Sequence, residues 1–227
     1  MLKAIVFDFD GVIANSEPLH FQAFRDVLAG EGITLTEADY YARLLGFDDV
    51  GVFTAVGDEH RAGWTAARVR ELATRKAAQL EAIEQGASVL FPGAADAIKR
   101  AAAAVPLAIA SGAIGAEIRR VLHRERLMEY FTVIVAAEDT PSSKPAPDPY
   151  LHAVARLAHI DGRDGVAAGE CVAIEDSRWG LESARAAGLK TVGVAQTYPA
   201  AELSAADLVI PTLDALDIEH LVKLCSK

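Results

Sequence analysis

The chain has 227 residues, of which 52% are hydrophobic and 24% charged, a composition typical of a folded globular protein and unlike that of a disordered one. Its net charge of −10 argues against a nucleic-acid partner, since sequence-independent binding of nucleic acid needs a basic surface. A local site on an acidic protein can still attract a small anion.

Short apolar runs alternate with amphipathic helical patterns along most of the chain. The runs predict six strands, at 4–7, 107–110, 133–136, 172–174, 191–194 and 208–210. The helical patterns lie at 94–103, 116–122, 148–157 and 178–187, and Gly188 is a plausible stop for the last. Continuous apolar strands that alternate with helices indicate an α/β fold with a parallel sheet covered on both faces.

One long segment interrupts this alternation. Residues 16–86 contain no convincing strand, while Phe21, Phe24, Val27 and Leu28 recur at helical spacing and 72–83 reads as a long helix. The segment is long enough for a core of its own, so we expect an inserted all-helical domain rather than extra helices packed on the sheet.

The chain gives no sign of a membrane span or a secretion signal. Gly, Pro or charged residues interrupt its apolar segments, and the first run is too short for a signal peptide. The two cysteines, Cys171 and Cys225, suit a reducing compartment, with a single disulfide left open. We expect a cytoplasmic protein that has no membrane partner.

Polar groups follow four of the predicted strands. They are Asp8 with Asp10, Ser111 with Gly112, Lys144 in a proline-rich loop, and Glu175 with Asp176. The carboxyl ends of parallel strands share one edge of a sheet, where ligands bind. We therefore expect these groups to meet in space.

Each group, taken singly, also has a simple structural explanation. Ser111 could cap the following helix, and Asp176 or Ser177 could cap the helix at 178–187. Lys144 could be a solvated loop lysine, and the first aspartate pair could hold a turn. Capping, however, does not require carboxylate pairs at the ends of two different strands.

Phosphoryl-transfer chemistry explains the whole set. Carboxylates brought together repel one another unless a cation joins them, and such oxygen ligands suit Mg²⁺ together with a substrate phosphate. Lys144 can face the phosphoryl group as a point charge, and the hydroxyl and backbone N–H groups at Ser111–Gly112 suit its oxygens. One carboxylate can attack phosphorus while another transfers a proton.

Four motifs, "DFDGV", "SGA", "KPAPDPY" and "IEDSRWGLESARAAG", resemble those of the haloacid dehalogenase superfamily. The resemblance follows family order over nearly the whole chain and is to the β-phosphoglucomutase-like phosphatases and phosphomutases. It implies a Rossmann-like, doubly wound parallel core at 1–15 and 87–227, with a helical cap domain at 16–86. The cap would exclude water and select the substrate.

The resemblance also implies roles for single residues. Asp8 would be the nucleophile and Asp10 the general acid/base. The implied magnesium ligands are Asp8, the Asp10 backbone carbonyl, Asp176 and Glu175, and the implied phosphate-binding residues are Ser111, Gly112 and Lys144. The metal-free dehalogenase branch lacks the second aspartate of the "DFD" motif, so we expect chemistry at phosphorus rather than at carbon.

The substrate is less defined. His20 and Lys76 occupy places similar to those of cap residues in β-phosphoglucomutase, although they could also be a surface histidine and a solvated lysine. The mutase pattern carries an arginine where this chain has Asp48 and Asp49, and an acidic pair would repel a second phosphate. Arg43, Arg61 or Arg68 could replace that arginine.

We expect a Mg²⁺-dependent phosphatase of a small phosphorylated metabolite, such as a sugar phosphate or phosphoglycolate, acting as a monomer or weak homodimer. The alternatives are a hexose phosphomutase and a catalytically idle protein that binds a phosphorylated ligand.

Overall fold

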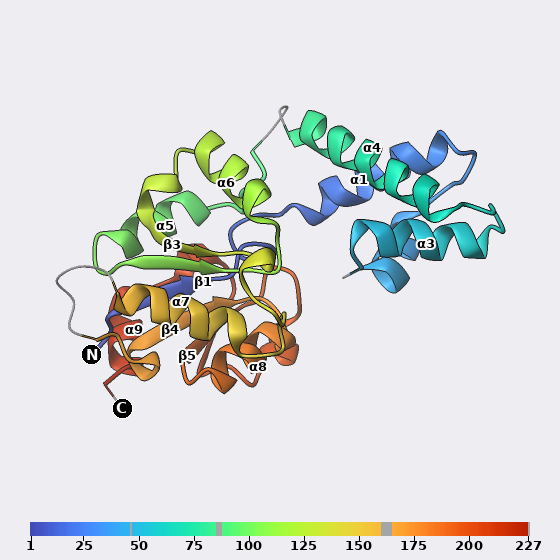
Figure 1. Cartoon of the computed structure of the whole chain (residues 1–227). Coiled ribbons are helices and arrows are strands. Elements are labelled where there is room, and N and C mark those ends of the chain that lie inside the picture. The colour runs from blue at the N-terminus through green and yellow to red at the C-terminus, as the bar shows by residue number, and fades with distance from the viewer. Residues whose placement is uncertain (46, 85–87, 160–164, 227) are drawn as a thin grey trace. The chain divides into compact units, whose positions relative to one another are not determined.

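The computed structural model describes residues 1–45, 47–84, 88–159 and 165–226. The chain divides into two compact units, one formed by Met1–Asn15 with Val89–Lys227 and the other by Ser16–Ser88. Figure 1 shows the sheet in the first unit and the helices α1, α3 and α4 in the second. The domain boundary expected at residues 86 and 87 lies outside the described residues.

The described part of the first unit contains a six-stranded parallel sheet with strand order β3-β2-β1-β4-β5-β6. The strands are β1 (Ala4–Phe7), β2 (Leu107–Ala110), β3 (Phe131–Val135), β4 (Cys171–Glu175), β5 (Lys190–Val194) and β6 (Leu208–Ile210). Central strand β1 pairs with β2 on one side and with β4 on the other, so Val6 lies between Ala108 and Ala173. The parallel sheet predicted from the apolar runs is confirmed, as is the doubly wound, Rossmann-like core that the family resemblance implies. The strand order reverses at β1, which is where ligands bind in such sheets.

Helices cover the sheet, so its central strands β2, β1 and β4 are buried along their whole length. Helices α7 (Asp148–Ala158) and α8 (Arg178–Ala186) pack on the face that carries Val6, Ala108 and Ala173. Helices α5 (Ala94–Ala102) and α6 (Gly115–Arg124) lie away from this face (Figure 1). The remaining elements are α9 (Ile218–Leu224) and the short helical turns η2 (Met128–Tyr130), η3 (Ala137–Asp139), η4 (Ala168–Glu170), η5 (Ala200–Leu203) and η6 (Leu213–Ala215).

The second unit is helical throughout its described residues. Its elements are α1 (Glu17–Ala29), α2 (Glu37–Asp39), η1 (Tyr40–Leu44), α3 (Asp49–Glu59) and α4 (Ala66–Glu84). Phe24, Leu28, Phe53 and Leu72 are buried in one apolar cluster, and the rings of Phe24 and Phe53 meet at a centroid distance of 5.4 Å. The unit therefore has a hydrophobic core of its own.

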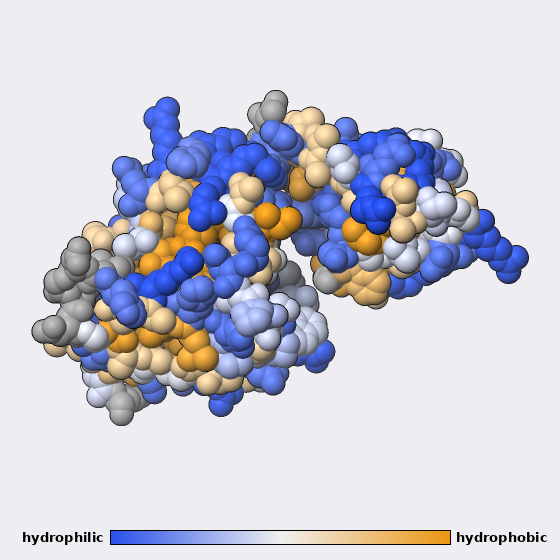
Figure 2. All heavy atoms as spheres, in the orientation of Figure 1, coloured by the Kyte–Doolittle hydropathy of each residue, from blue (hydrophilic) through white to orange (hydrophobic). Residues whose placement is uncertain are grey.

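The surface features agree with an ordinary globular protein. Figure 2 shows hydrophobic residues around edge strand β3, with hydrophilic residues among them. The side chain of Arg156 covers part of that edge, because it donates a hydrogen bond to the carbonyl oxygen of Ile134 at 2.8 Å. Within the described ranges, no helix combines the length and apolar character needed to cross a membrane. Cys171 and Cys225 are both free thiols.

Candidate active site

Three buried carboxylates meet at the carboxyl edge of the sheet. Asp8 follows β1, Glu175 ends β4, and Asp176 comes directly after β4. Each of the three has an oxygen within 4.8 Å of an oxygen of the other two. The parallel pairing of β1 with β4 produces this arrangement, because it brings the ends of the two strands side by side.

The cluster is electrostatically costly without a cation. Burial, together with the nearby charges of Asp8 and Glu175, raises the pKa of Asp176 to about 8. Burial also raises the pKa of Glu175, although the ammonium of Lys144 opposes this shift. A bound cation would favour the ionised form of these carboxyl groups and remove the repulsion between them. A set of hard oxygen donors fits a divalent metal ion.

Lys144 forms ion pairs with two of these carboxylates. Its Nζ lies 2.9 Å from Oδ1 of Asp8 and 2.6 Å from Oε1 of Glu175, and its side chain is only 12% exposed. Burial opposes the charge of Lys144, but the two carboxylates outweigh this effect and raise its pKa above the ordinary value. The alternative that Lys144 is a solvated loop lysine is therefore wrong.

The two carboxylate oxygens of Asp8 have different surroundings. Oδ1 accepts the backbone N–H of Phe9 at 2.7 Å and faces Lys144. Oδ2 makes no hydrogen bond or ion pair with any residue that the structure describes. Asp10, two residues further along, is partly exposed and pairs through its backbone with Ala14. The carboxylate of Asp8 is thus fixed through Oδ1, and its Oδ2 is available for reaction.

The second predicted polar group, Ser111 with Gly112, follows β2. Ser111 is buried, and its Oγ accepts the backbone N–H of Ala113 at 3.2 Å. The N-cap of α6 is Ile114, so the alternative of Ser111 as a helix cap is wrong. Gly112 is exposed in the turn, next to the buried hydroxyl.

Several partners of the cluster were not predicted from the sequence. The hydroxyl of Tyr150 donates to Oε1 of Glu175 at 2.6 Å, and the side chain of Thr197 is hydrogen-bonded to Asp176. Thr197 and Gln196 also donate to the backbone carbonyl of Gly11 at 3.3 Å. Only the position of Tyr150 at the end of the "KPAPDPY" motif could have indicated such a role.

Glycines provide the space that the cluster occupies. Gly11 has a φ of +76°, and a Cβ there would lie 1.9 Å from Oδ2 of Asp176. A Cβ on Gly180, in the first turn of α8, would lie 1.9 Å from Oε2 of Glu175. The N-cap of α8 is Ser177, whose side chain accepts the N–H of Gly180 at 3.1 Å, so Asp176 is not the cap.

The two predicted cap residues, His20 and Lys76, meet each other in the second unit. The Nζ of Lys76 lies 2.9 Å from Nδ1 of His20, 2.7 Å from Oδ1 of Asp49 and 4.6 Å from the ring centroid of Phe24. Lys76 is 1% exposed, so the alternative of a solvated lysine is wrong.

The structure also changes the interpretation of the acidic pair in this unit. Asp48 is the N-cap of α3 and accepts the N–H of Gly51 at 2.6 Å, while Asp49 forms the ion pair with Lys76. Both carboxylates have local structural partners. The repulsion that they would exert on a second phosphate is smaller than their sequence alone indicates.

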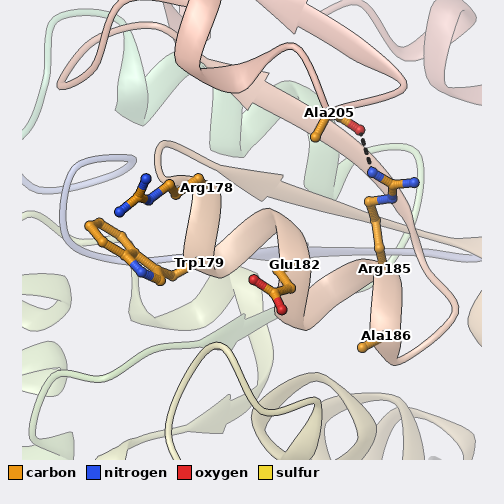
Figure 3. Close-up of a pocket in the computed structure, with 6 residues that line it drawn as sticks. All are labelled: Arg178, Trp179, Glu182, Arg185, Ala186 and Ala205. Carbon is orange, nitrogen blue, oxygen red and sulfur yellow. Dashed lines mark hydrogen bonds between the residues drawn. The ribbon is translucent and has the colours of Figure 1, made fainter.

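An open groove along α8 is distinct from the acidic cluster. Figure 3 shows its lining, with Arg178 against the ring of Trp179 near the start of the helix and Arg185 bonded to the carbonyl of Ala205. The guanidinium of Arg178 lies 4.4 Å from the ring centroid of Trp179. None of the predicted site residues lines this groove.

Comparison with known proteins defines the class. A family model described as haloacid dehalogenase-like hydrolase matches residues 5–194. The chain belongs to this family and is an enzyme of the phosphatase type. The family resemblance of the four motifs is thereby confirmed.

Individual relatives span nearly the whole chain. Protein CbbY of Rhodobacter capsulatus is 34% identical over 231 residues, which cover 98% of this chain and 99% of the relative. Hexitol phosphatase B of Escherichia coli (strain K12) is 31% identical over 229 residues, which cover 97% of each chain. The crystal structure of a putative β-phosphoglucomutase from Thermotoga maritima has a TM-score of 0.79 and 26% identity, over 98% of this chain and 99% of that one.

Proposed function

We propose that this enzyme hydrolyses a small sugar phosphate with the help of Mg²⁺ and that Asp8 is the nucleophile. The observation that carries the proposal is the buried cluster of Asp8, Glu175 and Asp176, with the ammonium of Lys144 2.9 Å from Asp8. The relative that is a hexitol phosphatase supports a phosphorylated carbohydrate as the substrate class.

The metal would be held by Asp8, the backbone carbonyl of Asp10 and Asp176, and it would neutralise charge on the phosphoryl oxygens. The N–H of Phe9 and Lys144 hold Oδ1 of Asp8, so its carboxylate is oriented before the substrate arrives. Lys144 offers its remaining N–H to the phosphoryl group, and the hydroxyl of Ser111 offers another donor.

Two steps complete the reaction. In the first, an oxygen of Asp8 bonds to phosphorus, the ester bond breaks, and the carboxylic acid of Asp10 gives its proton to the leaving alkoxide. In the second, water attacks phosphorus, Asp10 takes a proton from that water, and the bond between Asp8 and phosphorus breaks. Inorganic phosphate is released and both aspartates return to their starting forms.

A hexose phosphomutase is the second candidate, because His20 and Lys76 meet in the helical unit and because a putative β-phosphoglucomutase has the same fold. A mutase must bind two phosphates. Arg61 forms no ion pair among the described residues, but the other candidate cations of the helical unit already contact carboxylates: Lys76 pairs with Asp49, and Arg68 with Glu31 and Glu71. Arg43, likewise, pairs with Glu59. This pairing favours the phosphatase.

The test measures phosphate release from a hexitol phosphate, a hexose phosphate and phosphoglycolate, with Mg²⁺ or with EDTA. We expect phosphate release with Mg²⁺ but not with EDTA, and we expect Asp8→Asn to abolish it. The matched control Asp96→Asn changes an exposed aspartate on α5 and should release phosphate as the wild type does. Release by Asp8→Asn at the wild-type rate would refute the assigned nucleophile. Isomerisation of a hexose phosphate that depends on added bisphosphate, without net phosphate release, would identify the mutase instead.

A further inference from the structure

Both carboxylate oxygens of Glu175 accept hydrogen bonds from protein groups. Its Oε1 accepts hydrogen bonds from Lys144 Nζ and from the Tyr150 hydroxyl, both at 2.6 Å. Its Oε2 is the acceptor for the hydroxyl of Ser177 at 3.4 Å. The residue is 0% exposed, so no solvent shares its oxygens.

The first turn of α8 holds this carboxylate in place. A Cβ built on Gly180 would lie 1.9 Å from Oε2 and 2.1 Å from Oε1 of Glu175. Both oxygens therefore lie against the backbone of the helix. Turning an oxygen toward a cation would break the bonds to Lys144 or Tyr150.

The other two acids of the cluster are less constrained. Oδ2 of Asp8 has no hydrogen-bond or ion-pair partner among the described residues, and Asp176 faces the hydroxyl of Thr197. Asp8 and Asp176 are thus the side chains that can offer an oxygen to a metal without losing a charged partner.

The position of Glu175 determines the orientation of Lys144. An ammonium group has three protons in a tetrahedral arrangement. Two of the three are directed at Asp8 and Glu175, at 2.9 and 2.6 Å, which fixes the direction of the third. The ring of Tyr150 also lies 5.2 Å from this Nζ, so one buried tyrosine contacts both members of the ion pair.

We propose that Glu175 is the anchor of Lys144 rather than a ligand of the metal, and that the hydroxyl of Tyr150 is a positioning group that holds Glu175 in this role. The inference rests on the proposed phosphatase function, because the third proton of Lys144 is then aimed at the phosphoryl group. Tyr150 acts through Glu175 and Lys144 and does not itself touch the substrate.

Magnesium binding to the metal-free protein, measured by calorimetry, tests the role of Glu175 without any turnover. Glu175→Gln and Asp176→Asn each replace one carboxyl group of the cluster with an amide of similar size, so the difference between them isolates direct ligation. We expect Asp176→Asn to weaken Mg²⁺ binding by roughly tenfold more than Glu175→Gln, or by a larger factor. A smaller difference would overturn the proposal.

Steady-state kinetics of Tyr150→Phe test the hydroxyl, because phenylalanine keeps the ring and its packing. We expect kcat to fall roughly 10- to 100-fold, as for loss of a hydrogen bond to a charged group, with KM and Mg²⁺ affinity unchanged. The matched control is Tyr130→Phe, since Tyr130 precedes β3 at the opposite end of the sheet. A tyrosine with a merely structural role would lower the thermal midpoint and leave kcat unchanged.

The failure of this inference can be told apart from failure of the proposed function. If the wild type releases no phosphate in Mg²⁺, the function is wrong. If it does, and Tyr150→Phe keeps the wild-type kcat or Glu175→Gln loses Mg²⁺ as strongly as Asp176→Asn, only the inference is wrong.

Discussion

Gly180→Ala places a methyl group where the carboxylate of Glu175 now lies. The added Cβ would be 1.9 Å from Oε2 and 2.0 Å from Cδ of Glu175, well inside van der Waals contact. Glu175 cannot move away freely, because Lys144 and Tyr150 each hold its Oε1 at 2.6 Å. We therefore expect the substitution to disturb both stability and the position of Lys144.

The size of the effect follows from two opposing terms. Overpacking a filled site costs about 1–3 kcal/mol, whereas replacing glycine by alanine inside a helix contributes about 0.5–1 kcal/mol of stability. The two ranges leave a net loss of up to about 2.5 kcal/mol, which corresponds to a fall of up to about 10 °C in the thermal midpoint of a chain of this size. We also expect kcat to fall, since Lys144 loses its fixed partner.

The assay compares thermal unfolding and phosphate release of Gly180→Ala with those of Gly169→Ala. Gly169 is the matched control, because a Cβ there would meet nothing within 4 Å. We expect this control to keep the wild-type stability or to gain up to about 1 kcal/mol. If Gly180→Ala proved as stable and as active as Gly169→Ala, the close packing of Glu175 under α8 would be refuted.

Two further predictions concern charge. In EDTA, the carboxyl of Asp176 has a pKa of about 8 in the folded protein and near 4 when unfolded, so the free energy of unfolding falls progressively as the pH rises through this window. Urea unfolding of Asp176→Asn should therefore show a stability gain over wild type that is larger at pH 8 than at pH 5. An equal gain at the two pH values would contradict the assigned pKa shift. In the helical unit, Arg68 and Arg75 lower the pKa of Glu31 through hydrogen bonds of 2.6 and 2.8 Å. Glu31→Gln should accordingly lower the free energy of unfolding, measured in urea, by about 0.5–1 kcal/mol at pH 7 and leave it unchanged once the pH falls below the lowered pKa of Glu31. A loss of stability that did not depend on pH would argue against these ion pairs.

Much of the fold could be predicted from local patterns. The runs at 4–7, 107–110 and 208–210 match strands β1, β2 and β6 residue for residue. For β1 and β2 the reason is that a strand buried on both faces must be apolar along its whole length. Gly188 follows α8 with a φ of +86°, as expected of a glycine beyond a helix end. The boundaries of the other strands differed by one or two residues, partly because polar residues such as Glu175 extend a strand. The helix predicted at 72–83 begins six residues earlier, at Ala66.

The grouping of the acids was also predictable, because it depends on a topological rule. Parallel strands align their carboxyl ends, so Asp8, Glu175 and Asp176 were expected at one edge of the sheet, and the pairing of β1 with β4 then brings them together. The sequence pattern did not reveal which atoms these acids contact. Asp48 and Asp49 illustrate the limit, since the sequence suggested a free acidic pair and the structure gives one a helix to cap and the other a buried lysine.

The sequence by itself determined the α/β architecture, the family and the set of polar residues at the sheet edge, because each of these depends on residue type and spacing along the chain. Only the tertiary structure placed Tyr150 on Glu175, Thr197 on Asp176 and Gly180 beneath a carboxylate. Tyr150 and Thr197 lie 25 and 21 residues from the acids they contact, so no local periodicity encodes these contacts. They arise from the packing of α7, α8 and the loop after β5 against the sheet. This packing places particular hydrogen-bond donors within reach of each buried carboxylate, and a buried carboxylate needs such donors because it has lost its contact with water.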